Sequence, residues 1–300
     1  MDISVIVCSY NRCEHLRKLL KSLNEQAVPD ELGWEILVVD NNSSDDTART
    51  VEEMSGRNEK IFHYIFEGRQ GKSFALNAGV KAAHGNILAF TDDDAVLPRD
   101  WVRRIAEEFG KDAQLAGLGG RVELLDDGDN AIATRRGKLA VTLSVAHFPA
   151  DHIPIIGCNM AIRREVFDAV GFFDARLGPG AKGGVGEDLD YLYRACKAGF
   201  KFAYLPEVVV FHDHGRRTDV EVNRIKKRYI VGRGGFYWKH VRGGDWNVAK
   251  LAMWEIHGVL RRALRAGFSG ARMLKELSVL RDLMLGAFAL AVQRRPDDIA

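Results

Sequence analysis

The most informative stretch of the sequence is Ile87-Leu88-Ala89-Phe90-Thr91-Asp92-Asp93-Asp94, which combines a strand signal with a candidate site. Its first four residues form a short apolar run that predicts a buried strand. A buried strand does not normally end in three carboxylates, because each close pair repels by on the order of a few kcal/mol at an effective dielectric constant of about 20. A bound cation offsets such repulsion, and Mg²⁺ takes carboxylate oxygens together with substrate phosphates. The alternative is a solvated acidic turn after the strand.

Strand and helix signals alternate around this stretch. Continuous apolar runs predict strands at 3–9, 34–40, 61–66, 86–91, 118–124 and 208–211, and helical spacing predicts helices at 13–26, 45–55, 72–83, 100–109, 163–169 and 188–198. Such alternation implies an α/β fold with a Rossmann-like, mostly parallel sheet flanked by helices. Ligands bind such sheets outside the carboxyl ends of the strands, where Asp40 and the aspartate run both stand.

The charge of the 300-residue chain is distributed unevenly. Residues 1–213 hold 25 Lys and Arg against 33 Asp and Glu, whereas residues 214–300 hold 18 against 8. We therefore expect an α/β domain at 1–213 and a basic, amphipathic, helical region at 214–300. A basic region of this kind indicates a polyanionic partner, either membrane headgroups or nucleic acid. The alternative is that the basic region docks on the acidic domain itself.

The cysteines and the start of the sequence bear on the compartment. Cys8, Cys13, Cys158 and Cys196 show no C-x-x-C spacing, so neither a zinc site nor a disulfide framework is indicated. Met1-Asp2 leads directly into an apolar run, without the pattern of a secretory signal. We therefore expect a cytoplasmic location.

Arg69 and Lys72 lie at the start of the helix predicted over 72–83. Gly71-Lys72-Ser73 matches the end of a P-loop, but that motif requires a glycine five residues earlier, where Phe66 stands. The sequence therefore argues against a P-loop NTPase. Cations beside the N–H groups of a helix start can still hold a diphosphate, and we expect Arg69 and Lys72 to do so.

A glycine-rich segment and an acidic pair form a second candidate site. Five glycines lie between residues 178 and 186 and predict a mobile lid, which Glu187 and Asp188 follow directly. One of these carboxylates is suited to act as a general base toward a hydroxyl. The alternative is that Glu187 and Asp190 favour the N-terminus of the next helix through its dipole. His212, after the last predicted strand, is a candidate metal ligand, with a structural histidine as the alternative.

Five motifs in this order resemble the large family 2 of nucleotide-sugar glycosyltransferases, which have a GT-A fold. They are Val5-Ile6-Val7-Cys8-Ser9-Tyr10-Asn11-Arg12, Val38-Val39-Asp40-Asn41-Asn42-Ser43-Ser44, Gly71-Lys72-Ser73-Phe74-Ala75-Leu76-Asn77-Ala78-Gly79, Phe90-Thr91-Asp92-Asp93-Asp94 and Gly186-Glu187-Asp188. The stretches 157–163 and 205–212 also look like this family, so the resemblance covers approximately residues 3–213. It implies that 1–213 is a catalytic domain. The implied reaction is an inverting transfer of a sugar from a nucleoside diphosphate sugar, with UDP-sugars expected, to an acceptor hydroxyl in polysaccharide, glycolipid or cell-envelope glycan synthesis.

The resemblance also implies how the donor nucleotide is bound. Cys8, Tyr10 and Asp40 match positions that surround the nucleoside base, and Arg12 belongs to the same donor-binding motif. Asp190 departs from the pattern, since it offers a second carboxylate beside the matched base.

The family's D-x-D motif matches Asp92 and Asp94. Asp94 is expected to bind the metal, and Asp92 is expected to lie near the metal and the ribose. Asp93 is expected in the donor site, but the motif does not assign it a specific contact. His212 matches an additional metal-ligand position found in some GT-A enzymes, and Asp188 matches the catalytic base. Mg²⁺ or Mn²⁺ is the implied cofactor, bridging the diphosphate and neutralising charge on the leaving group.

Residues 246–292 predict two helices with an apolar and a basic side. Lys250, Arg261 and Arg265 line one face of the first helix, and this helix also contains Trp254. A basic amphipathic helix with tryptophan suits a membrane interface, whereas the apolar run at 283–292 is too short to span a bilayer. We expect peripheral attachment to the inner face of a membrane, a glycan or lipid-linked acceptor there, and no nucleic-acid partner. The alternative is packing on the α/β domain or on a dimer partner.

Two other classes of protein compete with this interpretation. A nucleotidyltransferase usually shows a glycine-rich phosphate loop after its first strand, and residues 8–12 lack one. A non-catalytic sugar-nucleotide or glycan-binding protein does not need a positioned base, so Asp188 in combination with Asp92 and Asp94 argues against it.

Overall fold

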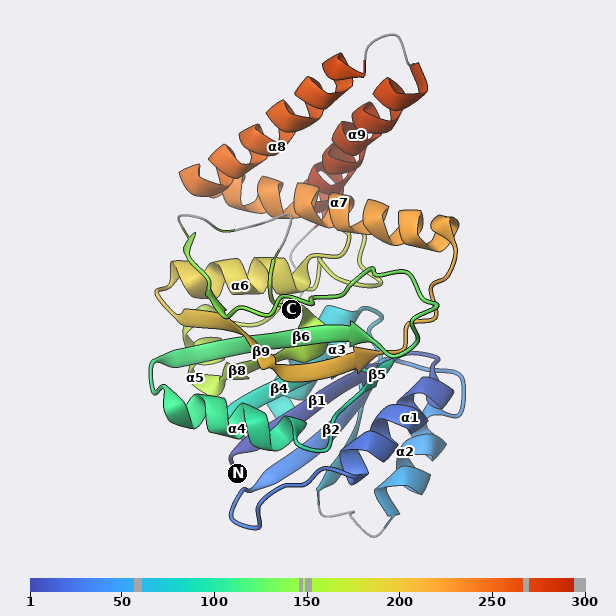
Figure 1. The fold of residues 1–300 in the computed structure, drawn as a ribbon, viewed down its shortest axis with the longest axis vertical. Coiled ribbons are helices and arrows are strands. Elements are labelled where there is room, and N and C mark those ends of the chain that lie inside the picture. The colour runs from blue at the N-terminus through green and yellow to red at the C-terminus, as the bar shows by residue number, and fades with distance from the viewer. Residues whose placement is uncertain (57–60, 146–147, 149–152, 267–269, 294–300) are drawn as a thin grey trace.

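The strands of the computed structural model, which describes residues 1–56, 61–145, 148, 153–266 and 270–293, form one nine-stranded sheet (Figure 1). They are β1 (Ile3–Ser9), β2 (Trp34–Asp40), β3 (Phe62–Phe66), β4 (Ile87–Asp92), β5 (Ala95–Val96), β6 (Leu115–Leu124), β7 (Val141–Thr142), β8 (Met160–Arg163) and β9 (Lys201–His212). The strand order is β3-β2-β1-β4-β8-β6-β9-β5, and β7 pairs with β9.

The strands β3, β2, β1 and β4 form a parallel half-sheet. The apolar runs of β1 and β2 are almost wholly buried, as expected for parallel strands covered on both faces. The register pairs Ser9 with Asp40 and Cys8 with Asp92, so the carboxyl ends of β2, β1 and β4 share one edge. The prediction that Asp40 and the aspartate run stand at the same edge is confirmed.

The other half of the sheet is mixed. β8, which the sequence did not predict, runs antiparallel between β4 and β6. β9 lies parallel to β6 and antiparallel to β5. It begins at Lys201 rather than at residue 208, because its first part also pairs with β6, ahead of a register shift between Gly120 and Arg121. The predicted α/β sheet flanked by helices is therefore confirmed, with the parallel arrangement concentrated in its N-terminal half.

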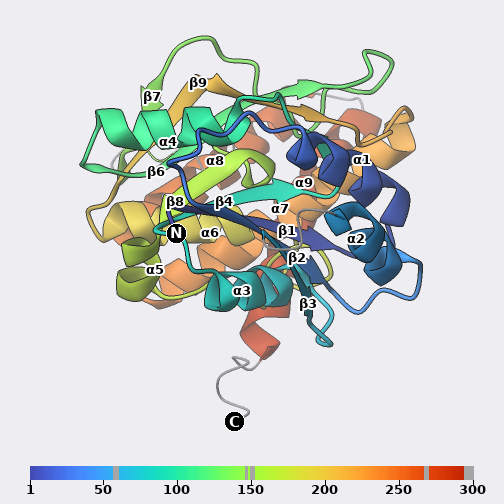
Figure 2. The ribbon, with the colours of Figure 1, turned by 90° about the horizontal axis from the view of Figure 1, so that it is seen from below.

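Helices pack on both faces of the sheet and, toward the C-terminal end of the chain, against one another. They are α1 (Cys13–Asn24), α2 (Thr47–Ser55), α3 (Lys72–Ala82), α4 (Trp101–Lys111), α5 (Arg164–Val170), α6 (Glu187–Lys197), α7 (Asp219–Arg242), α8 (Trp246–Arg265) and α9 (Gly270–Val292). Alternate side chains of a strand face opposite sides, so Val5 and Val7 pack with α1, α2 and α4, whereas Ile6 packs with α3, α5 and α6. Figure 2 shows α3 and α4 on opposite sides of the sheet.

The helices α7, α8 and α9 lie beyond α6, with α7 next to it (Figure 1). Glycines let the backbones of this region approach closely. A Cβ atom at Gly232 of α7 would lie 1.8 Å from the carbonyl oxygen of Val185, and one at Gly286 of α9 would lie 1.8 Å from that of Val231. Of the described helices, none combines the length and hydropathy needed to cross a membrane.

The glycine-rich segment before Asp188 is packed between α3 and α7. The N–H of Lys72 donates to the carbonyl of Pro179 at 2.9 Å, and the N–H of Val185 donates to the carbonyl of Arg228 at 3.1 Å. A Cβ atom at Gly184 would lie 2.4 Å from the backbone of α7. The glycines therefore permit close contact between backbones. The sequence, in contrast, had suggested that they make the segment a mobile lid.

Candidate active site

A pocket of about 450 Å³ lies at the carboxyl edge of the parallel half-sheet. The ends of β1, β4 and β9, the starts of α3 and α6, and the first turns of α7 contribute to its walls. Most of the predicted site residues meet in it, namely Cys8, Tyr10, Arg12, Lys72, Asp92, Asp93, Asp94, Asp188 and His212. Segments separated by up to two hundred residues in the sequence thus converge on one site.

Two predicted residues, Asp40 and Arg69, do not line this pocket. The buried carboxylate of Asp40 accepts a hydrogen bond from the N–H of Ser43 at 2.8 Å and another from the hydroxyl of Tyr64 at 2.8 Å. The guanidinium of Arg69 donates to the two carboxylate oxygens of Glu67 at 2.9 and 2.8 Å. In this structure both side chains are thus engaged with their neighbours outside the pocket.

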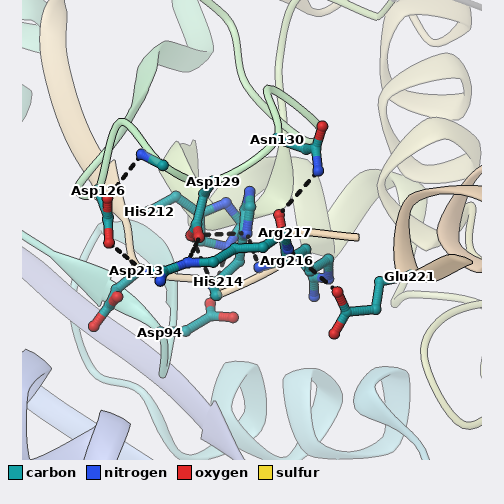
Figure 3. A network of polar contacts seen from close by, with 12 residues as sticks. Asp94, Asp126, Asp129, Asn130, His212, Asp213, His214, Arg216, Arg217 and Glu221 are labelled. Atoms are coloured by element: carbon teal, nitrogen blue, oxygen red, sulfur yellow. Dashed lines mark hydrogen bonds and ion pairs between the residues drawn. The ribbon is translucent and has the colours of Figure 1, made fainter. Parts of the chain in front are cut away.

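Asp92, Asp94 and His212 converge inside the pocket. One potential ligand atom of each lies within 4.8 Å of the others, and Nε2 of His212 is 3.0 Å from Oδ1 of Asp94 (Figure 3). Although burial favours the neutral acid, the hydrogen bond and charge of His212 and the charge of Arg12 hold the pKa of Asp94 well below its usual value. Carboxylate oxygens suit Mn²⁺ and Mg²⁺, and imidazole is a common ligand of divalent metals in general. The two carboxylates therefore fit the metal that the sequence predicts, and His212 can serve as an additional ligand.

Each aspartate of the run also has a basic side chain beside it. Lys72 forms an ion pair with Asp92. Nη1 of Arg12 lies 2.7 Å from Asp94 and 3.2 Å from Asp93. Burial nevertheless raises the pKa of Asp93 to about 6, because desolvation outweighs the attraction of Arg12. The repulsion within the run is therefore offset in large part by these side chains.

Asp188 is held at the N-terminus of α6. Its carboxylate accepts a hydrogen bond from the N–H of Leu189 at 2.8 Å and a longer one from the N–H of Gly157 at 3.3 Å. Both contacts fix the direction of a half-buried carboxylate that lines the pocket. The adjacent Glu187 is buried, and its pKa is raised by desolvation and by the charge of Asp188.

Asp190 has a different environment from Asp188. Its side chain is fully buried and lies 2.9 Å from Nε of Arg194, 2.8 Å from Nζ of Lys239 and 2.9 Å from Nε2 of His240. These partners hold its pKa far below the usual value in spite of burial. Asp190 therefore ties α6 to α7 and does not line the pocket.

The pocket also contains residues that the sequence interpretation missed. Arg216, Ile225, Arg228 and Tyr229, all from the region after residue 213, form part of its wall. They belong to none of the motifs described above. The only signal in the sequence that could have pointed to them is the positive charge of residues 214–300. Part of this basic region thus lines the acidic pocket at the edge of the sheet.

Comparisons with known proteins show which family the chain belongs to. A sequence model of one family, Glycosyl transferase family 2, matches residues 4–171. The chain is 28% identical over 260 residues to glycosyltransferase AglE of Haloferax volcanii, which covers 86% of this chain and 81% of that protein. Some other glycosyltransferase relatives are longer, and the chain spans 53% and 46% of two of them.

Two solved structures share the fold. TarS 1–349 from S. aureus in complex with UDP has a TM-score of 0.62 and 16% identity, over 97% of this chain and 83% of that one. The mannosyltransferase PcManGT from Pyrobaculum calidifontis, solved with GDP-Man and Mn²⁺, has a TM-score of 0.61 and 16% identity, over 97% and 87%. These likenesses establish the GT-A fold. Because the family match covers more than half of its length, the chain belongs to glycosyl transferase family 2 and is a glycosyltransferase.

Proposed function

We propose that this glycosyltransferase moves a sugar from a nucleoside diphosphate sugar, specifically a UDP-sugar, to an acceptor hydroxyl with inversion of configuration. The observation that carries the proposal is that Asp188 lines the same pocket as Asp92, Asp94 and His212. A proton acceptor and a metal-binding set side by side suit a displacement at a sugar carbon attached to a diphosphate. The UDP complex of TarS supports the choice of nucleotide.

In the proposed reaction, the acceptor oxygen attacks the anomeric carbon from the face opposite the diphosphate. Asp188 takes the proton of the acceptor hydroxyl as the new carbon–oxygen bond forms. The bond between the anomeric carbon and the phosphate oxygen breaks, and the nucleoside diphosphate leaves with the bonding electrons. When bound, Mg²⁺ or Mn²⁺ supplies Lewis-acid stabilisation of the charge on the departing phosphate. The ligands proposed for it are Asp94, Asp92 and His212.

The remaining walls of the pocket suit the donor nucleotide. Cys8 lies near the end of β1 and Tyr10 directly follows that strand, and we assign both to the nucleoside base. Asp40, at the end of the neighbouring strand, and Arg69 are assigned to the same donor site only by their place in the sequence, because neither lines the pocket. Lys72 lines it from the start of α3.

Two other functions are less consistent with these observations. Membership of the glycosyltransferase family argues against a nucleotidyltransferase. A sugar-nucleotide-binding protein without catalysis has no use for a carboxylate that two backbone N–H groups orient into the pocket, as Asp188 is.

We also propose that α8 and α9 attach the enzyme to a membrane surface, where a lipid-linked acceptor is available. Apolar side chains are strongly exposed on both helices, including Trp254 at 82%, Leu264 at 84% and Phe288 at 68%. Arg261 and Arg265 are exposed on the same helix as Trp254 and Leu264. Apolar side chains beside arginines suit an anionic lipid interface, and the proposed location is the cytoplasmic face of a membrane.

The function is tested by screening UDP-, GDP- and dTDP-sugars with Mn²⁺ for a shift in the thermal unfolding temperature. Donors that bind are then incubated with glycan or lipid-linked acceptors, and release of the nucleoside diphosphate is measured. The proposal predicts binding and acceptor-stimulated release for at least one UDP-sugar. A protein that binds no sugar nucleotide in the presence of Mn²⁺ contradicts it.

A further inference from the structure

Arg216 is a cation of the pocket that the mechanism above does not use. It follows β9 by four residues and lines the pocket together with the metal-binding set. Within the described residues, its guanidinium has no hydrogen bond and no ion pair. Arg12 and Lys72, by contrast, are both paired with aspartates in this pocket. Arg216 is therefore available to an anionic ligand, whereas Arg12 and Lys72 already neutralise protein carboxylates.

The backbone on both sides of Arg216 is held by a turn that follows β6 (Figure 3). The N–H of Asn130 donates to the carbonyl of Arg216 at 2.8 Å. The carboxylate of Asp129 accepts the N–H of Gly215 at 2.8 Å and Nε of Arg217 at 3.2 Å. Asp129 is almost fully buried, so these bonds are shielded from water.

The neighbouring residues Arg216 and Arg217 thus have different roles in the structure. Arg217 is bound by the turn through Asp129 and through an ion pair with Asp126. Arg216 extends from the backbone between two anchored residues and reaches the pocket. The N–H of Arg216 also donates to Nδ1 of His214 at 3.0 Å, which further restrains its backbone.

We propose that Arg216 binds the diphosphate of the donor, and that Asp129 is the positioning residue that holds it in place. This inference rests on the proposed function, since it assigns a group to the same donor site. A guanidinium presents a planar fork of donors that matches phosphate oxygens, and such charge-assisted bonds are stronger than neutral ones. The described carboxylates of the pocket repel a diphosphate. A cation that is not paired with one of these carboxylates therefore contributes more to the binding of a diphosphate than a paired cation does.

The test compares the affinities of UDP and UMP, measured by isothermal titration calorimetry in the presence of Mn²⁺. Arg216→Ala is expected to weaken UDP binding by about tenfold or more, as for the loss of a hydrogen bond to a charged group, and UMP binding by much less. Lys227→Ala removes the same charge from an exposed position of α7 that does not line the pocket, and it is expected to change neither affinity.

The role of Asp129 is tested by a double-mutant cycle. Asp129→Asn alone is expected to weaken UDP binding, but to have no further effect when Arg216 is already alanine. A purely structural role for Asp129 predicts the same loss in both backgrounds, and it would affect UMP equally. Equal UDP affinity in wild type and Arg216→Ala overturns the inference while leaving the proposed function intact. A wild-type protein that binds none of UDP, GDP and dTDP overturns both.

Discussion

His212 and Asp94 are 118 residues apart in the sequence, and their side chains meet at 3.0 Å between Nε2 and Oδ1. The backbone enforces this meeting. The short antiparallel ladder of β5 and β9 pairs His212 with Ala95, and the N–H of Asp213 donates to the carbonyl of Asp94 at 2.7 Å. The ladder thus joins the end of β9 to the residues after β4, and so brings His212 to Asp92 and Asp94, the proposed metal-binding set.

The first prediction concerns this metal-binding set. His212→Ala removes one of three converging donors and is expected to weaken Mn²⁺ binding by at least about tenfold, in line with the effects of disturbing metal ligation. Titration of Mn²⁺ in the presence of UDP, followed by electron paramagnetic resonance, measures it. His257→Ala, an exposed histidine of α8, is the matched control. Equal Mn²⁺ affinity in the two variants would remove His212 from the ligand set.

The second prediction concerns Asp190, which lies between α6 and three basic side chains. Asp190→Asn removes the buried carboxylate that Arg194, Lys239 and His240 share, although Lys239 keeps its ion pair with Asp174. The substitution is expected to lower the free energy of unfolding by about 3 to 5 kcal/mol near pH 7. The folded-state pKa of Asp190 is depressed, so its stabilisation is present above the unfolded pKa of about 4 and is lost as the pH falls through the folded pKa.

Urea unfolding of wild type and Asp190→Asn over a range of pH checks this. The difference in the free energy of unfolding between the two proteins is expected to stay constant above about pH 5 and to become smaller below about pH 4. Asp168→Asn, at an exposed position of α5, is expected to behave like wild type. A difference that does not change with pH would mean that the charge of Asp190 is not what stabilises the contact.

The third prediction concerns the contact of α7 with the segment before Asp188. A Cβ atom at Gly232 would collide with the carbonyl oxygen of Val185 at 1.8 Å, so Gly232→Ala is expected to cost about 1 to 3 kcal/mol, as overpacking does. Gly258→Ala in α8 is the matched control, since its Cβ would approach only the end of the Arg262 side chain at 3.4 Å. The control is expected to gain up to about 1 kcal/mol from helix propensity. Equal unfolding midpoints for the two variants would contradict the packing described here.

The fourth prediction concerns the exposed apolar side chains of α8. Trp254→Ser combined with Leu264→Ser is expected to reduce co-sedimentation with vesicles that contain phosphatidylglycerol, and wild-type binding is expected to fall as salt is added. Leu139→Ser is the control, because Leu139 is 80% exposed but lies outside this region. If wild type does not sediment with anionic vesicles, the membrane proposal is wrong.

Much of the parallel half-sheet could be predicted from the sequence, because β1, β2 and β4 are continuous apolar runs whose polar ends align by register. β8 could not, since its four residues are too short for a periodic signal and become a strand only by pairing with β4 and β6. The residues of the candidate site also differ in whether the sequence could predict them. Asp92 to Asp94 and Asp188 carry local patterns, whereas Arg216 enters the pocket only through tertiary contacts with the turn at Asp129.

The assignment of Asp188 as the base that accepts the acceptor's proton is tested most directly by the transfer activity of Asp188→Asn. An asparagine keeps the size of the side chain and still accepts an N–H bond, but it does not take a proton from an acceptor hydroxyl at neutral pH. We expect the UDP affinity of this variant in the presence of Mn²⁺ to stay close to that of wild type. Its transfer rate is expected to fall by about 100-fold or more, as for the loss of a general base. Near-normal transfer by Asp188→Asn would contradict this assignment.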